Sequence, residues 1–148
     1  MKLRIVWIGK TKSRELANLC MEYSDRIKHF LPLEIAEVKE IKAGIEAEAE
    51  KILNALDPSD RVVALDPNGK SWNSHELAKF IQKHMNENQR RLTFVIGGFA
   101  GLAESIKERA DVRWSLSPLT FTHDLTRVIL LEQLYRALTI IRNLPYSK

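Results

Sequence analysis

Cysteine and long hydrophobic runs are both scarce in this sequence of 148 residues. The single cysteine, Cys20, excludes a disulfide within the chain, and no spacing of cysteine and histidine resembles a metal site. The apolar run in residues 1–9 is too short for a signal peptide, because Lys10 and Lys12 close it off. We therefore expect a cytoplasmic protein without a bound metal.

The overall balance of residues is that of a globular protein. Hydrophobic residues make up 45% and charged residues 28% of the chain, and the length suits one domain spanning residues 1–148. The net charge of +4 comes from 23 Lys and Arg against 19 Asp and Glu. Such a charge is compatible with a polyanionic partner, but it is also common in proteins that bind none.

Hydrophobic periodicity alternates between the strand and the helix pattern along the chain. Alternation or β-branched runs predict strands at residues 1–9, 33–38, 61–65, 92–96 and 112–116. Helical spacing predicts helices at residues 16–30, 45–56, 77–85, 102–106 and 124–143. Ser13 can cap the first of these helices, and Asn73 and Glu76 have the spacing of a capping box before the third. This order favours a mostly parallel α/β sheet with helices on both faces.

Two local expectations follow from the pattern. The residues Asp66-Pro67-Asn68-Gly69 should end the third strand in a turn. The acidic residues Glu46, Glu48 and Glu50 should lie on the solvated face of the second helix.

The last predicted helix is apolar on nearly all sides, since ten of the fourteen residues 128–141 are hydrophobic. Glu132, Gln133 and Arg136 interrupt a stretch that is already shorter than the roughly 20 apolar residues of a membrane span. We therefore expect the helix to be buried, with its spare apolar surface against a second subunit.

Ligands of parallel α/β sheets collect beyond the carboxyl ends of strands. Three loops qualify here: the one after Leu65, the glycine loop 97–101, and the segment 116–123. The glycine loop has neither a dinucleotide fingerprint nor the Lys-Ser/Thr of a phosphate loop, so neither NAD nor ATP is implied. Its spacing alone fits a tight turn as well as a ligand site.

His123 and Arg127 lie one helical turn apart at the start of the last helix, so they can act together. The alternatives are a capping histidine and an arginine that needs an anionic partner, because a cation near a helix start opposes the dipole. In the basic C-terminal third, Tyr146 fits stacking on an exposed base, but the same residues can simply confer solubility.

Five motifs follow one another in the second half of the chain: Leu65-Asp66 with Gly69-Lys70, Ile96-Gly97-Gly98 with Gly101, Leu116-Ser117 with Leu119-Thr120-Phe121, His123 with Arg127, and Glu132-Gln133-Leu134-Tyr135-Arg136-Ala137. Together they resemble the RlmH family of the SPOUT superfamily, whose members methylate N3 of a pseudouridine in large-subunit (23S) ribosomal RNA. The resemblance covers essentially the whole chain. It implies a C-terminal trefoil knot, a homodimer, and ribosomal RNA, in the assembled ribosome or free, as the partner.

The resemblance also implies S-adenosylmethionine as the cofactor and places its pocket at Leu65, Gly97, Gly98, Leu116, Ser117, Pro118, Leu119, Thr120 and Phe121. A pseudouridine N3 carries a proton and must become nucleophilic. Arg127 would stabilise the developing anion, while His123 or Tyr146 takes or relays the proton.

Two positions depart from the family pattern. Phe99 replaces a residue that is often smaller or proline, and Ser147 replaces a common histidine of the tail. Two rival functions remain: a non-catalytic RNA- or ribosome-binding protein of the same fold, and an unrelated α/β enzyme for a small nucleotide. Calorimetry with S-adenosylmethionine separates all three, because only the methyltransferase should prefer this cofactor.

Overall fold

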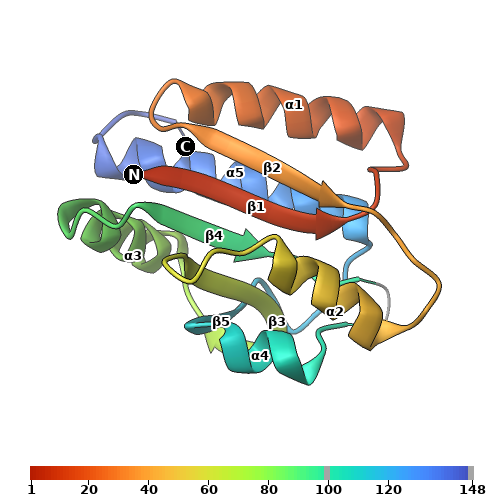
Figure 1. Cartoon of the computed structure of the whole chain (residues 1–148). Coiled ribbons are helices and arrows are strands. Elements are labelled where there is room, and N and C mark those ends of the chain that lie inside the picture. The colour runs from red at the N-terminus through yellow and green to blue at the C-terminus, as the bar shows by residue number, and fades with distance from the viewer. Residues whose placement is uncertain (99–100, 147–148) are drawn as a thin grey trace.

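The computed structural model describes residues 1–98 and 101–146. Within them five strands alternate with five helices, as the periodicity predicts (Figure 1). The elements are β1 (Lys2–Ile8), α1 (Arg14–Lys28), β2 (Leu33–Val38), α2 (Ile45–Asn54), β3 (Arg61–Ser71), α3 (Ser74–Asn86), β4 (Arg91–Val95), α4 (Glu104–Arg109), β5 (Val112–Ser115) and α5 (His123–Ile141).

The strands form one sheet in the order β2-β1-β4-β3-β5, and every neighbouring pair is parallel. Strand β1 lies between β2 and β4, with Leu3 beside Leu33 of β2 on one side and beside Leu92 of β4 on the other. The expected parallel α/β sheet is therefore confirmed. The C-terminal trefoil knot stays a prediction.

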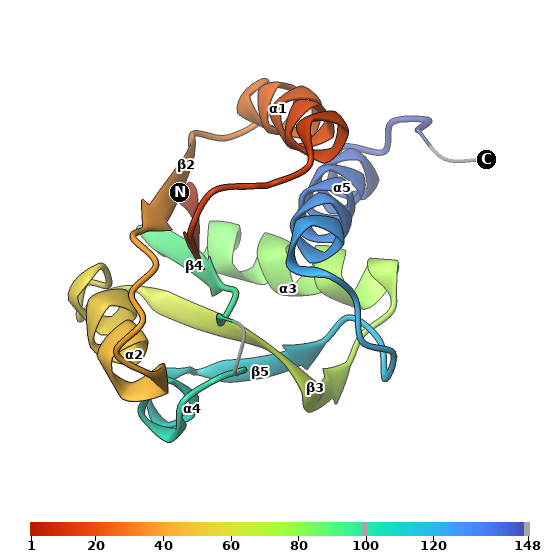
Figure 2. The ribbon, with the colours of Figure 1, turned by 90° about the vertical axis from the view of Figure 1, so that its right-hand side faces the viewer.

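Helices cover both faces of the sheet, as predicted. Figure 2 shows α1, α3 and α5 over one face and α2 and α4 over the other. Side chains of β1 alternate between two cores because successive residues of a strand point to opposite faces. Leu3, Ile5 and Trp7 enter the core under α1, α3 and α5, whereas Val6 and Ile8 enter the core under α2 and α4.

Side-chain caps fix where several helices begin. The Ser13 hydroxyl accepts the Leu16 N–H at 3.3 Å before α1, as the sequence predicts. Before α3, the Asn73 side chain accepts the Glu76 N–H at 2.8 Å and the Glu76 carboxylate accepts the Asn73 N–H at 3.1 Å. This is the predicted capping box.

The expected turn after Leu65 is wrong, because β3 continues through Asp66–Gly69 to Ser71. The strand stays paired with β5 through a bulge, in which both Leu65 and Lys70 lie opposite Trp114. Gly69 makes the close approach possible, since a Cβ there would lie 2.5 Å from the backbone carbonyl of Arg113. The turn-forming residues thus serve as a bulge that keeps the strand extended.

Helix α5 packs between α1 and α3, and the apolar pattern correctly predicts its burial. Leu130, Leu131, Leu134 and Ala137 are fully buried. Among the described residues, no helix is long and apolar enough to cross a membrane.

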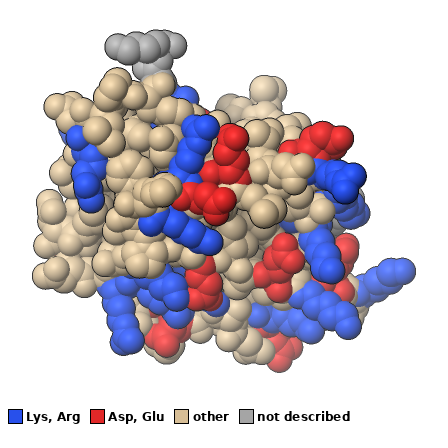
Figure 3. All heavy atoms as spheres, turned by 90° about the horizontal axis from the view of Figure 1, so that it is seen from above, with Lys and Arg blue, Asp and Glu red and all other residues tan. Residues whose placement is uncertain are grey.

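The charged side chains are mixed on the face that α1 covers. Figure 3 shows positive and negative groups interleaved there, with tan areas between them, rather than one continuous positive patch. The net charge of +4 is therefore not concentrated on this face.

Candidate active site

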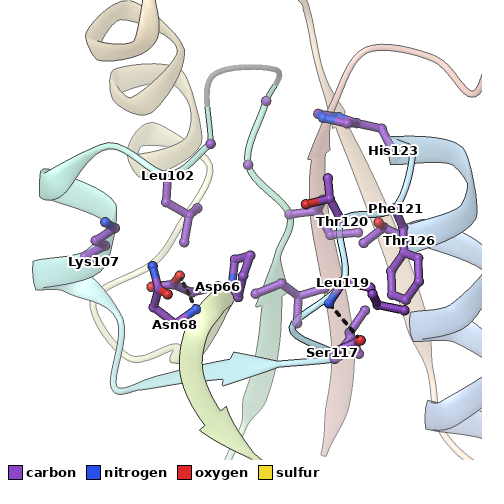
Figure 4. Close-up of a pocket in the computed structure, with 17 residues that line it drawn as sticks. Asp66, Asn68, Leu102, Lys107, Ser117, Leu119, Thr120, Phe121, His123 and Thr126 are labelled. Atoms are coloured by element: carbon purple, nitrogen blue, oxygen red, sulfur yellow. Dashed lines mark hydrogen bonds between the residues drawn. The ribbon is translucent and has the colours of Figure 1, made fainter.

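The bulge of β3 and the loops after β4 and β5 meet and form a cavity of about 400 Å³, which we call the first cavity. Its size falls in the range of small-molecule sites, roughly 300–1,000 Å³. Figure 4 shows Asp66 and Asn68 on one side of it and Ser117 and Leu119 on the other. The lining residues are Leu65, Asp66, Pro67, Asn68, Ile96, Gly97, Gly98, Gly101, Leu102, Lys107, Leu116, Ser117, Leu119, Thr120, Phe121, His123 and Thr126.

The glycines after β4 form a tight turn that is also a cavity wall. Gly98 and Gly101 form an antiparallel bridge, in which the Gly101 N–H donates to the Gly98 carbonyl at 3.0 Å. A Cβ at Gly97 would lie 2.9 Å from both the Gly101 carbonyl oxygen and Leu102 Cδ2. The turn therefore needs glycine and lines the first cavity, while a role of these glycines in ligand binding stays a prediction.

The loop between β5 and α5 is held by its own hydroxyl groups. Ser117 Oγ accepts the Leu119 N–H at 3.0 Å, and Thr122 Oγ1 accepts the Leu125 N–H at 3.2 Å to cap α5. The Leu119 side chain is 69% exposed although it lines the first cavity. The loop thus presents a fixed backbone and an apolar side chain to any ligand there.

A second cavity of about 520 Å³ adjoins the first. The two share Gly98, Thr120, Phe121 and His123, so these residues form a common wall. The other residues lining the second cavity are Ile8, Gly9, Lys10, Lys12, Glu40, Glu48, Thr122, Asp124 and Arg127.

Glu48 does not lie on a solvated face, so that expectation is wrong. Its side chain is half-buried and lines the second cavity, whereas Glu46 and Glu50 are exposed. A Cβ added to Gly98 would meet Glu48 Oε1 at 2.3 Å. The missing side chain at Gly98 therefore gives the Glu48 carboxylate room beside the common wall.

His123 is the first residue of α5 and reaches both cavities, as Figure 4 shows for the first. Burial lowers the pKa of His123 below its ordinary value, and the nearby positive charge of Arg127 lowers it further. The imidazole is therefore neutral at neutral pH and can accept a hydrogen bond.

Arg127 is 2% exposed and lines only the second of the two cavities. Its guanidinium donates to the Ile8 carbonyl at 2.6 Å and to Thr11 Oγ1 at 3.0 Å, and it lies 4.5 Å from the centre of the Trp7 ring. The sequence suggested an anionic partner for this cation, but these partners are neutral groups of β1 and of the loop after it. Arg127 therefore fixes the loop that borders the second cavity.

Tyr146 lies beyond the opposite end of α5 and lines neither cavity. Its hydroxyl donates to Glu132 Oε2 at 2.9 Å and lies 3.3 Å from the Tyr23 hydroxyl. Burial, followed by these hydrogen bonds, raises the pKa of Tyr146 above its ordinary value. Glu132 lies nine residues along α5 from His123, so about 14 Å of helix separates the contact of the Tyr146 hydroxyl from the start of α5 at 1.5 Å per residue.

The structure brings together most residues that the sequence singles out. All of the predicted cofactor residues line the first cavity except Pro118, which does not. His123 joins the first cavity to the second, Arg127 belongs to the second, and Tyr146 stands apart. Phe99 and Ser147 lie outside the described residues.

The sequence reasoning missed the loop after β1 and the acidic side chains facing the second cavity. Gly9, Lys10 and Lys12 follow a strand in the same way as the three chosen loops, so the strand-end rule would have found them. Nothing in the sequence pattern marks Glu48. In the described residues, no three or more His, Cys, Asp or Glu side chains are grouped to hold a metal ion.

Comparisons with known proteins agree on one family. The family described as Predicted SPOUT methyltransferase matches residues 1–147. The chain is 45% identical over 151 residues to the Ribosomal RNA large subunit methyltransferase H of Geobacter metallireducens, covering 99% of this chain and 98% of that protein. It is 42% identical over 154 residues to the protein of the same name from Christiangramia forsetii, again covering 99% and 98%.

A solved structure shows the same fold at low sequence identity. The tRNA (m1G37) methyltransferase from Aquifex aeolicus superposes with a TM-score of 0.58 and 14% identity, covering 100% of this chain and 77% of that one. The arrangement of the sheet and its helices is therefore one that methyltransferases use.

Proposed function

The chain belongs to the SPOUT methyltransferase family, and on this premise we propose that it methylates N3 of a pseudouridine in large-subunit ribosomal RNA, using S-adenosylmethionine. The observation that carries the proposal is identity of about 40% over nearly the whole length of relatives named for large-subunit ribosomal RNA. We place the reaction in the cytoplasm, on the assembled ribosome.

The first cavity fits the cofactor by size and by its lining. Backbone of Gly97 and Gly98 and of the 116–121 loop lines it together with Leu65, so a nucleoside can meet both peptide groups and apolar side chains. When bound, the cofactor supplies an electrophilic methyl group on a sulfonium. The residues of the first cavity orient that group, and no acid or base is needed on the donor side.

The common wall is the proposed place of methyl transfer, because only there do the two cavities meet. The neutral imidazole of His123 stands at this wall and can orient the acceptor base or relay its proton. Arg127 keeps its positive charge behind the second cavity, where it favours negative charge that develops on the base.

Tyr146 of the same protomer lines neither cavity and is hydrogen-bonded to Glu132 and Tyr23, so this residue serves such a site only if a second copy of the chain brings its own Tyr146 there. The exposed large apolar side chains support pairing. Of the five described residues in this class, Leu119 lines the first cavity, while Leu19 and Met21 lie on α1, Leu125 lies on α5, and Leu144 follows α5. We propose a homodimer formed through α1 and α5.

We expect a dimer in solution, with a mass by light scattering twice the 17.0 kDa of one chain. An obligate interface buries roughly 2,000 Å² or more, so the dimer should persist at micromolar concentration. The variant Leu125→Glu should shift the protein towards monomer, since it places a charge on the apolar surface. A wild-type monomer under these conditions contradicts the proposal.

The proposed function is tested by mass spectrometry of ribosomal RNA from a strain that lacks this protein. We expect one pseudouridine of the large subunit to lose its methyl group, and the purified protein to restore that group on the strain's ribosomes. Unchanged RNA masses would contradict the proposal.

A further inference from the structure

An acceptor base held in the second cavity can reach a methyl group in the first, since the two cavities share one wall. This step rests on the proposed function. Arg127 supplies an independent sign of a ligand. Its Nε is buried without a hydrogen-bond partner in the described residues, although the side chain lines the cavity. Such a donor costs about 1–3 kcal/mol unless a ligand provides an acceptor.

Glu48 is the acidic group beside the common wall. Its carboxylate lies against Gly98, which belongs to both cavities. The Glu48 backbone N–H donates to the Gly44 carbonyl, but within residues 1–98 and 101–146 no hydrogen bond or ion pair engages the Glu48 carboxylate. Asp124, another acid of the second cavity, is already engaged, because its carboxylate accepts the backbone N–H groups of Lys12 and Ser13. Glu48 is therefore available to a ligand where Asp124 is not.

The surroundings of Glu48 favour uptake of a proton. Burial raises the pKa of the Glu48 carboxyl above its ordinary value, and the negative charge of Glu40 raises it further. The charged and titratable groups that face the same cavity are Lys10 and Lys12 after β1, Glu40 after β2, and His123, Asp124 and Arg127 on α5. A raised pKa makes the Glu48 carboxylate a stronger base, which favours proton transfer to it.

We propose that the second cavity holds the base to be methylated and that Glu48 accepts the proton from the base nitrogen. In this step the nitrogen forms a bond to the methyl carbon, and the carbon–sulfur bond of the cofactor breaks with its electron pair left on sulfur. The N–H proton passes to the Glu48 carboxylate, directly or through His123, and then to water. Atoms and charge balance without a further reactant.

The test compares Glu48→Gln with Glu50→Gln, a matched control that removes an exposed carboxylate from the same helix. The substrate is the ribosomes of the strain that lacks this protein. In single turnover at neutral pH, Glu48→Gln should be about 10²- to 10⁴-fold slower than wild type, the usual contribution of a general base. Glu50→Gln should match wild type. Affinity for S-adenosylmethionine by calorimetry should stay within a few-fold in both variants.

Two measurements on pH give readouts that a purely structural role would not move. The wild-type rate should rise with pH as Glu48 loses its proton, and Glu48→Gln should lack that limb. The variant Glu40→Gln should shift this rise in rate to lower pH, because it removes the charge that raises the pKa of Glu48.

The raised pKa of Glu48 also makes stability depend on pH. The free energy of unfolding falls as the pH rises from the ordinary pKa of a glutamate to the higher pKa of Glu48 in the folded protein. Over that window, unfolding should show wild type losing stability relative to Glu48→Gln.

Each contrary result contradicts a different part of the proposal. A wild-type rate in Glu48→Gln overturns the role of Glu48 and leaves the proposed function intact. Loss of cofactor affinity in Glu48→Gln overturns it as well, because Glu48 would then belong to the cofactor site. No methyl transfer by the wild-type protein overturns the proposed function itself, whatever the variants do.

Discussion

The variant Gly97→Val is expected to bind S-adenosylmethionine at least about 100-fold more weakly than wild type, a loss of about 2.8 kcal/mol. Binding should weaken because the valine side chain would collide with neighbouring atoms of the protein itself. A Cβ at position 97 already lies 2.9 Å from the Gly101 carbonyl oxygen and from Leu102 Cδ2, and valine adds two methyl groups. The loop must move, and Gly97, Gly101 and Leu102 all line the first cavity. Calorimetry measures the loss.

A matched variant separates damage to the cavity from a general loss of stability. Gly44→Val puts the same side chain in a loop where a Cβ meets nothing within 4 Å but φ is +105°. It should lower the melting temperature, because valine rarely adopts that conformation, and leave cofactor affinity unchanged. Gly97→Val should keep its circular dichroism spectrum, since β4 ends at Val95. Wild-type affinity in folded Gly97→Val would remove the glycine loop from the cofactor site.

The variant Arg127→Ala should lose about 2–4 kcal/mol of folding stability and be tenfold to a thousandfold slower in single-turnover methyl transfer. The loss of stability follows from the Ile8 carbonyl and Thr11 hydroxyl, which lose a buried charged donor. The loss of rate follows because the loop after β1 is released and the positive charge behind the second cavity disappears. Chemical denaturation and single-turnover kinetics measure the two effects.

Two further arginine variants identify the cause. Arg127→Lys keeps the charge but not the planar fork, so it should recover only part of both losses. Arg142→Ala removes an exposed arginine at the other end of α5 and should change stability by less than about 0.5 kcal/mol. Since Arg127 is buried, the salt dependence of RNA binding should not change in Arg127→Ala. A slope shallower by about one would instead assign Arg127 to a phosphate.

The fold was predictable where local chemistry and tertiary packing agree. Ser13 and Asn73 accept backbone N–H groups at helix starts, and capping needs only nearby residues. The buried runs of β1 and β4 are apolar because helices cover both faces. At Asp66–Gly69 the local signal failed, because pairing with β5 outweighs the preference of these residues for a turn.

The candidate site was predictable from strand ends and the family motifs, except where distant contacts decide. In the sequence, Glu48 has the pattern of an exposed acid on an amphipathic helix. In the structure, its carboxylate occupies the space beside Gly98, which the sequence pattern does not indicate. The sequence indicates that Arg127 needs an anionic partner, but its guanidinium contacts the Ile8 carbonyl and the Trp7 indole ring of β1 instead. From the sequence, Tyr146 is grouped with His123 for proton transfer, but in this protomer the Tyr146 hydroxyl contacts Glu132 and Tyr23, and Tyr146 lines neither cavity.

The strand order determines when the sheet can form during synthesis on the ribosome. β1 is made first, but its partner β4 begins at Arg91, so the centre of the sheet cannot close until about 90 residues have been synthesised. At roughly 5–20 residues per second this takes at least several seconds. During that time Leu3, Ile5 and Trp7 have no cover from α5, which is synthesised last of all the elements. The core under α1, α3 and α5 can therefore be completed only when translation is nearly finished.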